Sequence, residues 1–257
     1  SPGNLPADAE VFGTLDANRN EMFVEALEHI IAIWTSDAPY RLTGKYWNIT
    51  TERTHLPKLG QGVMGKPYQK PYPPILGTVV APYSKGIVGL GERGWYAISA
   101  NFLLPKWVAT HWPLFAEGCA KVGRVADRKD WRVAKSIFVA DDERIAEEYG
   151  KGSNSPYRFY FQQLGGKLRM ANKLNLFKTE LDQPDDEITT DHMVDTLVIT
   201  GTVNSVVNQL LAFRDEIGDF GTLVYNGADW VDRDLGRRSM ELMATEVIPR
   251  LNDAIGD

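Results

Sequence analysis

Apolar positions along the chain alternate between short continuous runs and longer segments with helical spacing. The short runs are rich in β-branched and aromatic residues and cover residues 75–80, 96–99, 131–139 and 222–225. Runs of this kind, bounded by glycine, proline or charged residues, are typical of strands buried on both faces of a parallel sheet. The sequence therefore predicts four parallel strands, adjacent in that order and joined by right-handed crossovers.

Amphipathic segments fill most of the intervals between these runs. The first helix is expected to begin at a cap on Asp16 or Asn18. Its apolar residues recur on one face, at Met22, Phe23, Ala26, Leu27, Ile30, Ile31 and Trp34. Further helices are predicted at residues 84–93, 105–122, 203–217 and 235–248. Because proline disrupts helical hydrogen bonding, Pro113 predicts a kink or early break, and Pro249 predicts an end or a kink.

Four segments depart from this alternation. Residues 40–51 read as a hairpin, and residues 57–74, rich in glycine and proline, read as a surface connection. Residues 193–199 are apolar and fit either a helix or a strand. An excursion over about residues 150–190 carries an aromatic cluster at 157–161. It is expected to be partly helical and to cover an active site or to form an oligomer contact.

The alternation of strands and helices predicts an α/β fold with a parallel sheet or barrel, as one domain over residues 1–257. Four strands are half of an eight-stranded TIM barrel, and the helix that ends at Trp34 has no strand before it. We therefore expect an incomplete copy of such a barrel, with the inward faces of Val79, Ile98 and Val224 open to water. Another polypeptide or further strands would then complete it.

Composition excludes several classes of function. The chain has 257 residues, 43% hydrophobic and 24% charged, and a formal net charge of −6, which argues against a nucleic-acid surface. No apolar run is long enough for a membrane span, and no signal peptide is recognised. A single cysteine, Cys119, suits a reducing cytoplasm and reads as an inert buried thiol. The four histidines are scattered without metal-ligand spacing, so no metal site is expected.

One stretch offers candidate chemistry. The first strand leaves through Ala81-Pro82-Tyr83-Ser84, and Ser84 can cap the helix that follows. In a parallel α/β protein this places a helix N-terminus, with free N–H groups and a positive dipole end, beside the carboxyl end of a strand. A phosphorylated ligand fits such a place. The alternative is a capped helix that binds nothing.

Several short segments, in their order and spacing, resemble the carboxyl-terminal portion of bacterial luciferase-like flavin monooxygenases. They are Asp8-Ala9-Glu10-Val11-Phe12-Gly13, the helix at 19–34, Gly44-Lys45-Tyr46-Trp47, Lys70-Pro71-Tyr72-Pro73-Pro74-Ile75, Gly94-Trp95-Tyr96-Ala97-Ile98-Ser99, Gly123-Arg124, Trp131-Arg132-Val133, Gly201-Thr202 and Phe220-Gly221-Thr222-Leu223-Val224-Tyr225. The resemblance covers nearly all of the chain. It implies a TIM barrel that binds reduced FMN at the carboxyl ends of its strands, with this chain supplying about the last four.

The resemblance also implies where the flavin lies. Ala81, Pro82, Tyr83 and Ser84 match the loop after the fifth strand, which contacts the FMN phosphate and ring in that family. Ser99 and Asn101 match the end of the sixth strand, beneath the flavin. No residue is identified as a catalytic proton donor.

The function expected from the resemblance is insertion of one oxygen atom from O2 into a small apolar organic substrate. A separate flavin reductase that uses NAD(P)H would supply the reduced FMN, and a homo-oligomer or a chain supplying the missing strands is expected. Two alternatives stay open: a deazaflavin-dependent oxidoreductase of the same superfamily, and a non-catalytic flavin-binding or assembly protein or inactive fragment.

Overall fold

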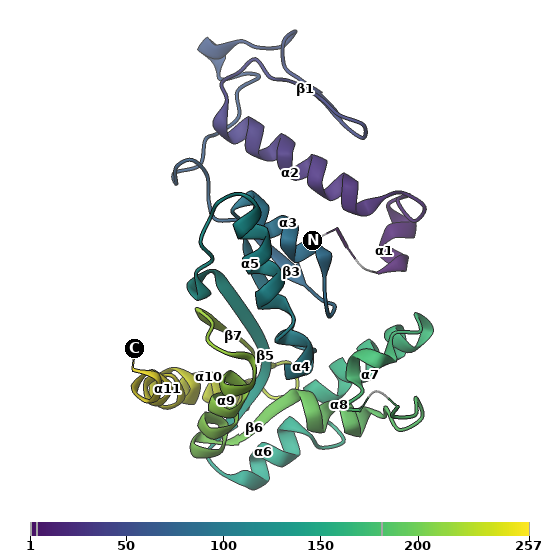
Figure 1. The fold of residues 1–257 in the computed structure, drawn as a ribbon, viewed down its shortest axis with the longest axis vertical. Helices are drawn as coiled ribbons and strands as arrows, with labels where there is room; N and C mark the ends of the chain where they lie inside the picture. The colour runs from purple at the N-terminus through teal and green to yellow at the C-terminus, as the bar shows by residue number, and fades with distance from the viewer. Residues whose placement is uncertain (1, 4, 181, 257) are drawn as a thin grey trace. The chain divides into compact units, whose positions relative to one another are not determined.

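The computed structural model describes residues 2–3, 5–180 and 182–256. The chain forms two compact units, Ser1–Ile75 and Leu76–Asp257, which are described separately below (Figure 1). The prediction of one domain over residues 1–257 stays a prediction.

The first unit consists of helices and a small antiparallel hairpin. It contains α1 (Pro6–Val11), α2 (Arg19–Thr35), β1 (Arg41–Thr43), β2 (Asn48–Thr50) and the short 3-10 turn η1 (Pro57–Leu59). The predicted long helix is confirmed as α2, and Asn18 caps it by accepting the Glu21 N–H at 3.2 Å. None of the α2 residues is fully buried, although its apolar side is half-buried.

The predicted hairpin is confirmed, and a carboxylate from α2 holds its turn. Glu25 accepts hydrogen bonds from the backbone N–H groups of Lys45, Tyr46 and Trp47 at 2.8–2.9 Å. A Cβ on Gly44 would lie 2.2 Å from one Glu25 carboxylate oxygen. The Gly-Lys-Tyr-Trp segment therefore needs glycine at its first position so that the carboxylate can reach the three amides.

The second unit is built on a parallel sheet of five strands, in which β3, β4, β5 and β6 follow one another and β7 pairs with β5. The strands are β3 (Leu76–Val79), β4 (Tyr96–Ser99), β5 (Trp131–Ala140), β6 (Val198–Thr202) and β7 (Thr222–Asn226). The pairings β3–β4, β4–β5 and β5–β7 are all parallel, so the predicted order of the four strands is confirmed.

The predicted count of four strands was wrong, because β6 is a fifth. The ambiguous segment at 193–199 is divided: α8 (Thr190–Leu197) ends within it and β6 begins at Val198. Strand β5 is long enough to take β7 along residues 132–136 and β6 along residues 136–140. An apolar run too short to reveal a period could not show where the helix gives way to the strand.

Helices cover one face of this sheet much more completely than the other. A Cβ on Gly77 would lie 2.4 Å from the Leu90 side chain of α3, so Gly77 faces the helices. Val79, two residues further along the strand, and the residues paired with these two on neighbouring strands lie on the same face. Val79 is 2% exposed, so the expectation that it faces inward and is open to water was wrong. Ile98 and Val224 lie on the opposite face and are half-buried, whereas Leu76 on that face is 40% exposed.

The remaining helices follow the strands in the expected alternation (Figure 1). They are α3 (Lys85–Arg93), α4 (Pro105–Val108), α5 (His111–Lys121), the 3-10 turn η2 (Arg128–Asp130), α6 (Glu143–Gly150), α7 (Pro156–Met170), the 3-10 turn η3 (Leu174–Phe177), α9 (Val203–Ile217), α10 (Arg233–Leu242), the π-helical segment η4 (Met243–Val247) and α11 (Ile248–Ile255). The partly helical character of the excursion is confirmed by α7 and η3. No helix among the described residues is both long and apolar enough to cross a membrane.

Pro113 and Pro249 each lie in the first turn of a helical segment. The expected break falls at residues 109–110, between α4 and α5, and Pro113 sits in the first turn of α5, where a missing N–H is tolerated. The last helix continues past Pro249, which lies one turn or less after the π-helical segment that ends at Val247. A π turn changes the carbonyl pairing that an α-helical proline would disrupt.

Candidate functional site

The site begins where β3 ends, in the loop that joins it to α3. Helix α3 starts after Ser84, as predicted, and Gly94 ends it in a left-handed conformation (φ 72°). The Ser84 hydroxyl makes no capping hydrogen bond to the described residues of its helix. Its oxygen is therefore not used for the role that serine most often has at such a position.

Tyr83 in this loop has an unusual backbone conformation. Its φ of 49° lies in the left-handed region, which residues other than glycine seldom adopt. Its side chain is 68% exposed, and its ring meets the Trp107 ring edge-on with centroids 6.4 Å apart. Strained backbone of this kind is held by its surroundings and is frequent at functional sites.

A buried histidine connects this loop to the end of β4. His111, at the start of α5, is 0% exposed. Its Nδ1 lies 2.8 Å from the Ser99 Oγ, and its Nε2 lies 2.9 Å from the Ala81 carbonyl oxygen. The Trp131 indole N–H donates to the same Ser99 Oγ at 2.9 Å. One hydrogen-bonded row thus joins the loop after β3, the carboxyl end of β4 and the first residue of β5.

The protonation of this row follows from its partners. A carbonyl can only accept, so His111 Nε2 carries a proton and donates to Ala81. Burial lowers the His111 pKa to about 4, against the opposing effect of the Ala81 carbonyl, so the ring is neutral near pH 7. Nδ1 is then the acceptor, and the Ser99 hydroxyl donates to it. His111 is fully enclosed and hydrogen-bonded at both nitrogens, so it orients its neighbours and does not act as an acid or base.

A second polar row joins the segment after β4 to the middle of β5. The Asn101 side-chain amide donates to the Ser136 Oγ at 2.9 Å, and the Tyr160 hydroxyl of α7 lies 3.4 Å from the Asn101 Oδ1. Asn101 is 9% exposed and Ser136 is 1% exposed. Burial raises the pKa of Tyr160, so its hydroxyl is protonated and can donate. This row gives the sheet end a fixed set of polar atoms within apolar surroundings.

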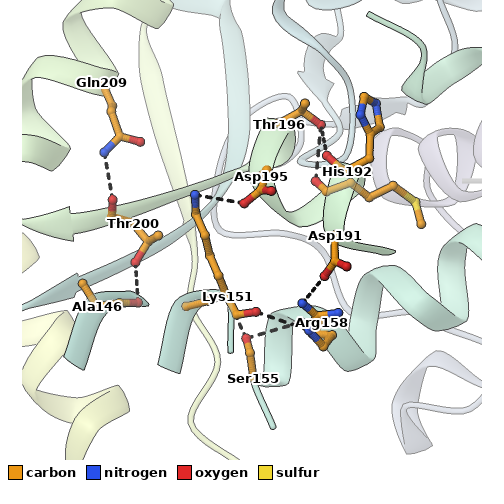
Figure 2. Close-up of polar contacts among 12 residues, drawn as sticks. Ala146, Lys151, Ser155, Arg158, Asp191, His192, Asp195, Thr196, Thr200 and Gln209 are labelled. Carbon is orange, nitrogen blue, oxygen red and sulfur yellow. Dashed lines mark hydrogen bonds and ion pairs between the residues drawn. The ribbon is translucent and has the colours of Figure 1, made fainter. Parts of the chain in front are cut away.

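Contacts with α6, α8 and β5 fix the position of α7. The Ser155 Oγ caps α7 by accepting the Tyr157 N–H at 3.1 Å, and the Tyr157 hydroxyl donates to the Ile137 carbonyl of β5 at 2.6 Å. Figure 2 shows Arg158 reaching the Lys151 carbonyl and the Asp191 carboxylate. In the same view, the Lys151 ammonium pairs with Asp195 at 3.2 Å. The excursion is thus a packed layer, and its role as a cover for the site stays a prediction.

The structure brings some of the predicted flavin-binding residues together. Ala81 and Ser99 lie on either side of the His111 ring, and Pro82, Tyr83 and Ser84 continue the same loop. Asn101 belongs to the second row. Their role in cofactor binding stays a prediction.

Sequence reasoning missed His111 and Tyr160 as parts of this region, and also Thr110, whose Oγ1 accepts the Tyr83 N–H at 3.1 Å. Their partners lie between 12 and 59 positions away in the chain, and no local pattern links them. The clearest available signal was the helix break expected near Pro113, since Thr110 and His111 lie where the chain turns from α4 into α5.

Comparison with known proteins gives one family. The model of the luciferase-like monooxygenase family matches residues 2–219. The 4-hydroxyprotoasukamycin monooxygenase of Streptomyces nodosus subsp. asukaensis is 26% identical over 261 residues, which cover 98% of this chain and 64% of that protein. The limonene 1,2-monooxygenase of Rhodococcus erythropolis is 23% identical, over 99% of this chain and 60% of that protein. The chain thus spans less than two thirds of the length of these curated relatives.

Solved structures show the same fold. The oxygenating constituent of the 3,6-diketocamphane monooxygenase of Pseudomonas putida, determined in complex with FMN, superposes with a TM-score of 0.82 at 22% identity. The superposition covers 98% of this chain and 69% of that structure. Together with the family match over residues 2–219, this α/β architecture establishes that the chain belongs to the luciferase-like monooxygenase family.

Proposed function

We propose that this chain forms the flavin-binding part of a monooxygenase that uses reduced FMN and O2 to insert one oxygen atom into a small apolar organic substrate. The observation that carries the proposal is the loop over residues 81–84, which leads from the carboxyl end of β3 into the N-terminus of α3. Membership of the family and the FMN found in a structure of the same fold support it.

The residues of this loop fit FMN chemically. The first N–H groups of α3 lack partners within the helix, and the positive end of its dipole favours a phosphate. The Ser84 hydroxyl is not engaged in capping and is available to donate to a phosphate oxygen. Tyr83 offers an exposed ring for contact with the isoalloxazine, and Ser99 and Asn101 lie at the end of the neighbouring strand.

Reduced FMN, when bound, supplies the oxygen-activating chemistry of this family. The tasks left to this chain are to bind and orient the cofactor, to exclude water and to admit the substrate. Two aromatic residues in the segments that follow β3 and β7 are more than half exposed: Tyr83 (68%) and Trp230 (60%). Exposed aromatic rings after two strand ends suit contact with an apolar substrate.

We propose further that additional β-strands, from the same or another chain, cover the open face of the sheet and complete an eight-stranded barrel of which these are about the last strands. Parallel sheets are buried on both faces as a rule, yet Leu76 is 40% exposed and Thr78 beside it is exposed. A second copy of this chain, in a homo-oligomer, is an alternative to additional strands as the group that covers the open face of the sheet. A separate reductase that uses NAD(P)H would supply the reduced FMN.

A flavin titration tests the proposal. Anaerobic addition of reduced FMN should give saturable binding, and 18O from 18O2 should appear in the product of an apolar test substrate such as a cyclic ketone or terpene. Replacing Ser84 by Ala should weaken FMN binding by roughly 1–3 kcal/mol, about 5- to 150-fold, because a hydrogen bond to a charged phosphate is lost. Ser153→Ala, at an exposed serine, is the matched control and should change nothing.

The alternatives give different results in the same titration. Binding of a deazaflavin in preference to FMN, with no 18O incorporation, would indicate a deazaflavin-dependent oxidoreductase. FMN binding without turnover on any apolar substrate would indicate a non-catalytic flavin-binding protein. Failure of both flavins to bind would refute the proposal.

A further inference from the structure

We propose that Thr110 and His111 form a two-residue clamp that sets the conformation of the loop at 81–83 and so positions it to bind FMN. The two side chains act on opposite ends of the loop: the His111 Nε2–H donates to the Ala81 carbonyl at 2.9 Å, and the Thr110 Oγ1 accepts the Tyr83 N–H at 3.1 Å. This inference rests on the proposed function, because it concerns the same loop.

The loop needs such a clamp because its backbone is not stable in this form by itself. Tyr83 has a φ of 49°, which a residue with a Cβ adopts only when its surroundings hold it. Its side chain is 68% exposed, so packing of the tyrosine ring supplies little of that restraint. The two hydrogen bonds from residues 110 and 111 are therefore the contacts that fix the loop.

Each of the two clamp residues is itself held in one orientation. The Thr110 hydroxyl donates to the Trp107 carbonyl at 2.7 Å, which leaves its lone pairs directed at Tyr83. The Ser99 hydroxyl donates to His111 Nδ1, and the Trp131 indole N–H fixes Ser99 in turn. The ring of His111 can therefore present only a donor to Ala81.

Both clamp residues lie where α4 gives way to α5. Helix α4 ends at Val108 and α5 begins at His111, with Ala109 and Thr110 in right-handed helical conformation between them, and the side chains of Thr110 and His111 both reach the loop. The Trp107 indole N–H donates to the Leu176 carbonyl of η3 at 3.1 Å, which anchors the preceding turn.

A pair of amide variants tests the histidine half of the clamp. Gln at position 111 can place an N–H near the position of the imidazole Nε2 and donate to Ala81, whereas Asn reaches only as far as Nδ1. We expect His111→Gln to retain most of the FMN affinity and His111→Asn to lose about ten-fold, the effect of one hydrogen bond. Equal FMN affinity in the two variants would contradict a role for the hydrogen bond to Ala81.

A second pair tests the threonine half. Thr110→Val is nearly isosteric and removes the acceptor of the Tyr83 N–H, whereas Thr110→Ser retains it. Thr110→Val should speed hydrogen exchange of the Tyr83 amide in the absence of flavin and weaken FMN binding about ten-fold. Thr110→Ser should leave both quantities within two-fold of the native protein.

A flavin-independent measurement separates this inference from the proposed function. Nitrogen-15 NMR of the histidine rings should show His111 as the neutral Nε2–H tautomer near pH 7, whether or not FMN binds. A native protein that binds no FMN would refute the proposed function, and the tautomer and amide exchange would still report on the clamp. FMN binding that is equal in the native protein, His111→Asn and Thr110→Val, with each variant folded, would overturn the clamp, as would an Nδ1–H or charged His111.

Discussion

Lys135 is a buried cation, and replacing it should stabilise the protein. It lies on the helix-covered face of β5, is 2% exposed, and its Nζ sits 5.0 Å from the centre of the Phe213 ring of α9. Burial lowers its pKa from 10.5 to about 8, with Glu216 acting in the opposite direction. Lys135→Met keeps an unbranched chain of similar length and removes the charge.

The size of the effect follows from that lowered pKa. One pKa unit is worth about 1.4 kcal/mol, so folding with a charged Lys135 is penalised by about 3 kcal/mol near pH 7. The substitution also removes the contact of the ammonium with the Phe213 ring, and this loss offsets about 0.5–2 kcal/mol of the stabilisation. Lys135→Met should therefore be more stable at pH 7 by about 1–3 kcal/mol.

The lowered pKa of Lys135 also predicts how the stability of the native protein changes with pH. Between pH 8 and 10.5 the unfolded chain holds the Lys135 proton and the folded chain releases it, so native stability rises with pH across this window. Below pH 8 the penalty is fully present and constant. The advantage of Lys135→Met should therefore be largest at pH 7 and shrink by pH 9.5.

Urea unfolding followed by tryptophan fluorescence at pH 7 and pH 9.5 measures this difference. Lys129→Met, at an exposed lysine of η2, is the control and should change the free energy of unfolding by less than about 0.5 kcal/mol at either pH. Destabilisation by Lys135→Met at pH 7, or an advantage equal at both pH values, would show that the ammonium is well solvated in the folded protein.

Three further predictions concern packing, the hairpin and the open face. Gly118→Ala should destabilise the protein by about 3 kcal/mol in thermal or urea unfolding, because its Cβ would lie 2.1 Å from a backbone carbonyl oxygen of α3, whereas Gly166→Ala, in open space, should be neutral or slightly stabilising; equal effects would refute the close helix contact. Glu25→Ala should speed amide exchange in the turn between β1 and β2. Burial raises the Glu25 pKa, but the three backbone N–H groups bring it below its usual value, so in the native protein the protection of these amides should be lost as the pH falls through that lowered pKa. Unchanged exchange would show that the carboxylate does not hold the turn. In the assembled FMN-binding protein, a cysteine at Thr78 should react with a maleimide far more slowly than one at the exposed Val125, and equal rates would contradict a covered sheet face.

The parts of the fold that the sequence predicts are those with a local signal. The helix from Lys85 to Arg93 lies between Ser84 at the N-cap position and Gly94 at its end, and the helix from Val203 to Ile217 has a clear apolar side. Strand Tyr96–Ser99 begins and ends at the residues that the sequence predicts. Each of these follows from capping, periodicity or turn chemistry within the element itself.

The parts that it does not predict depend on distant partners. Strand β6 exists because it pairs with the second half of β5, and Val198 looks no different from the apolar helix end before it. The same holds for Val79, whose face of the sheet is set by its register with Ser99 and Val133. Register between strands is a long-range property, and a short apolar run with no polar alternation does not encode it locally.

The candidate site shows the same division. The loop and its helix cap are visible in Ala81-Pro82-Tyr83-Ser84, because they lie in one continuous segment. The row that joins Ala81, His111, Ser99 and Trp131 is not, because it assembles residues from the loop after β3, the strands β4 and β5 and one helix.

The most direct test of the account is a structure of the protein crystallised with FMN. The account predicts the flavin phosphate at the start of α3, within hydrogen-bond reach of the Ser84 hydroxyl and the first backbone N–H groups of that helix, and the isoalloxazine over the carboxyl ends of β3 and β4 near Tyr83. An FMN bound elsewhere on the protein, with the residues at 81–84 untouched, would contradict it.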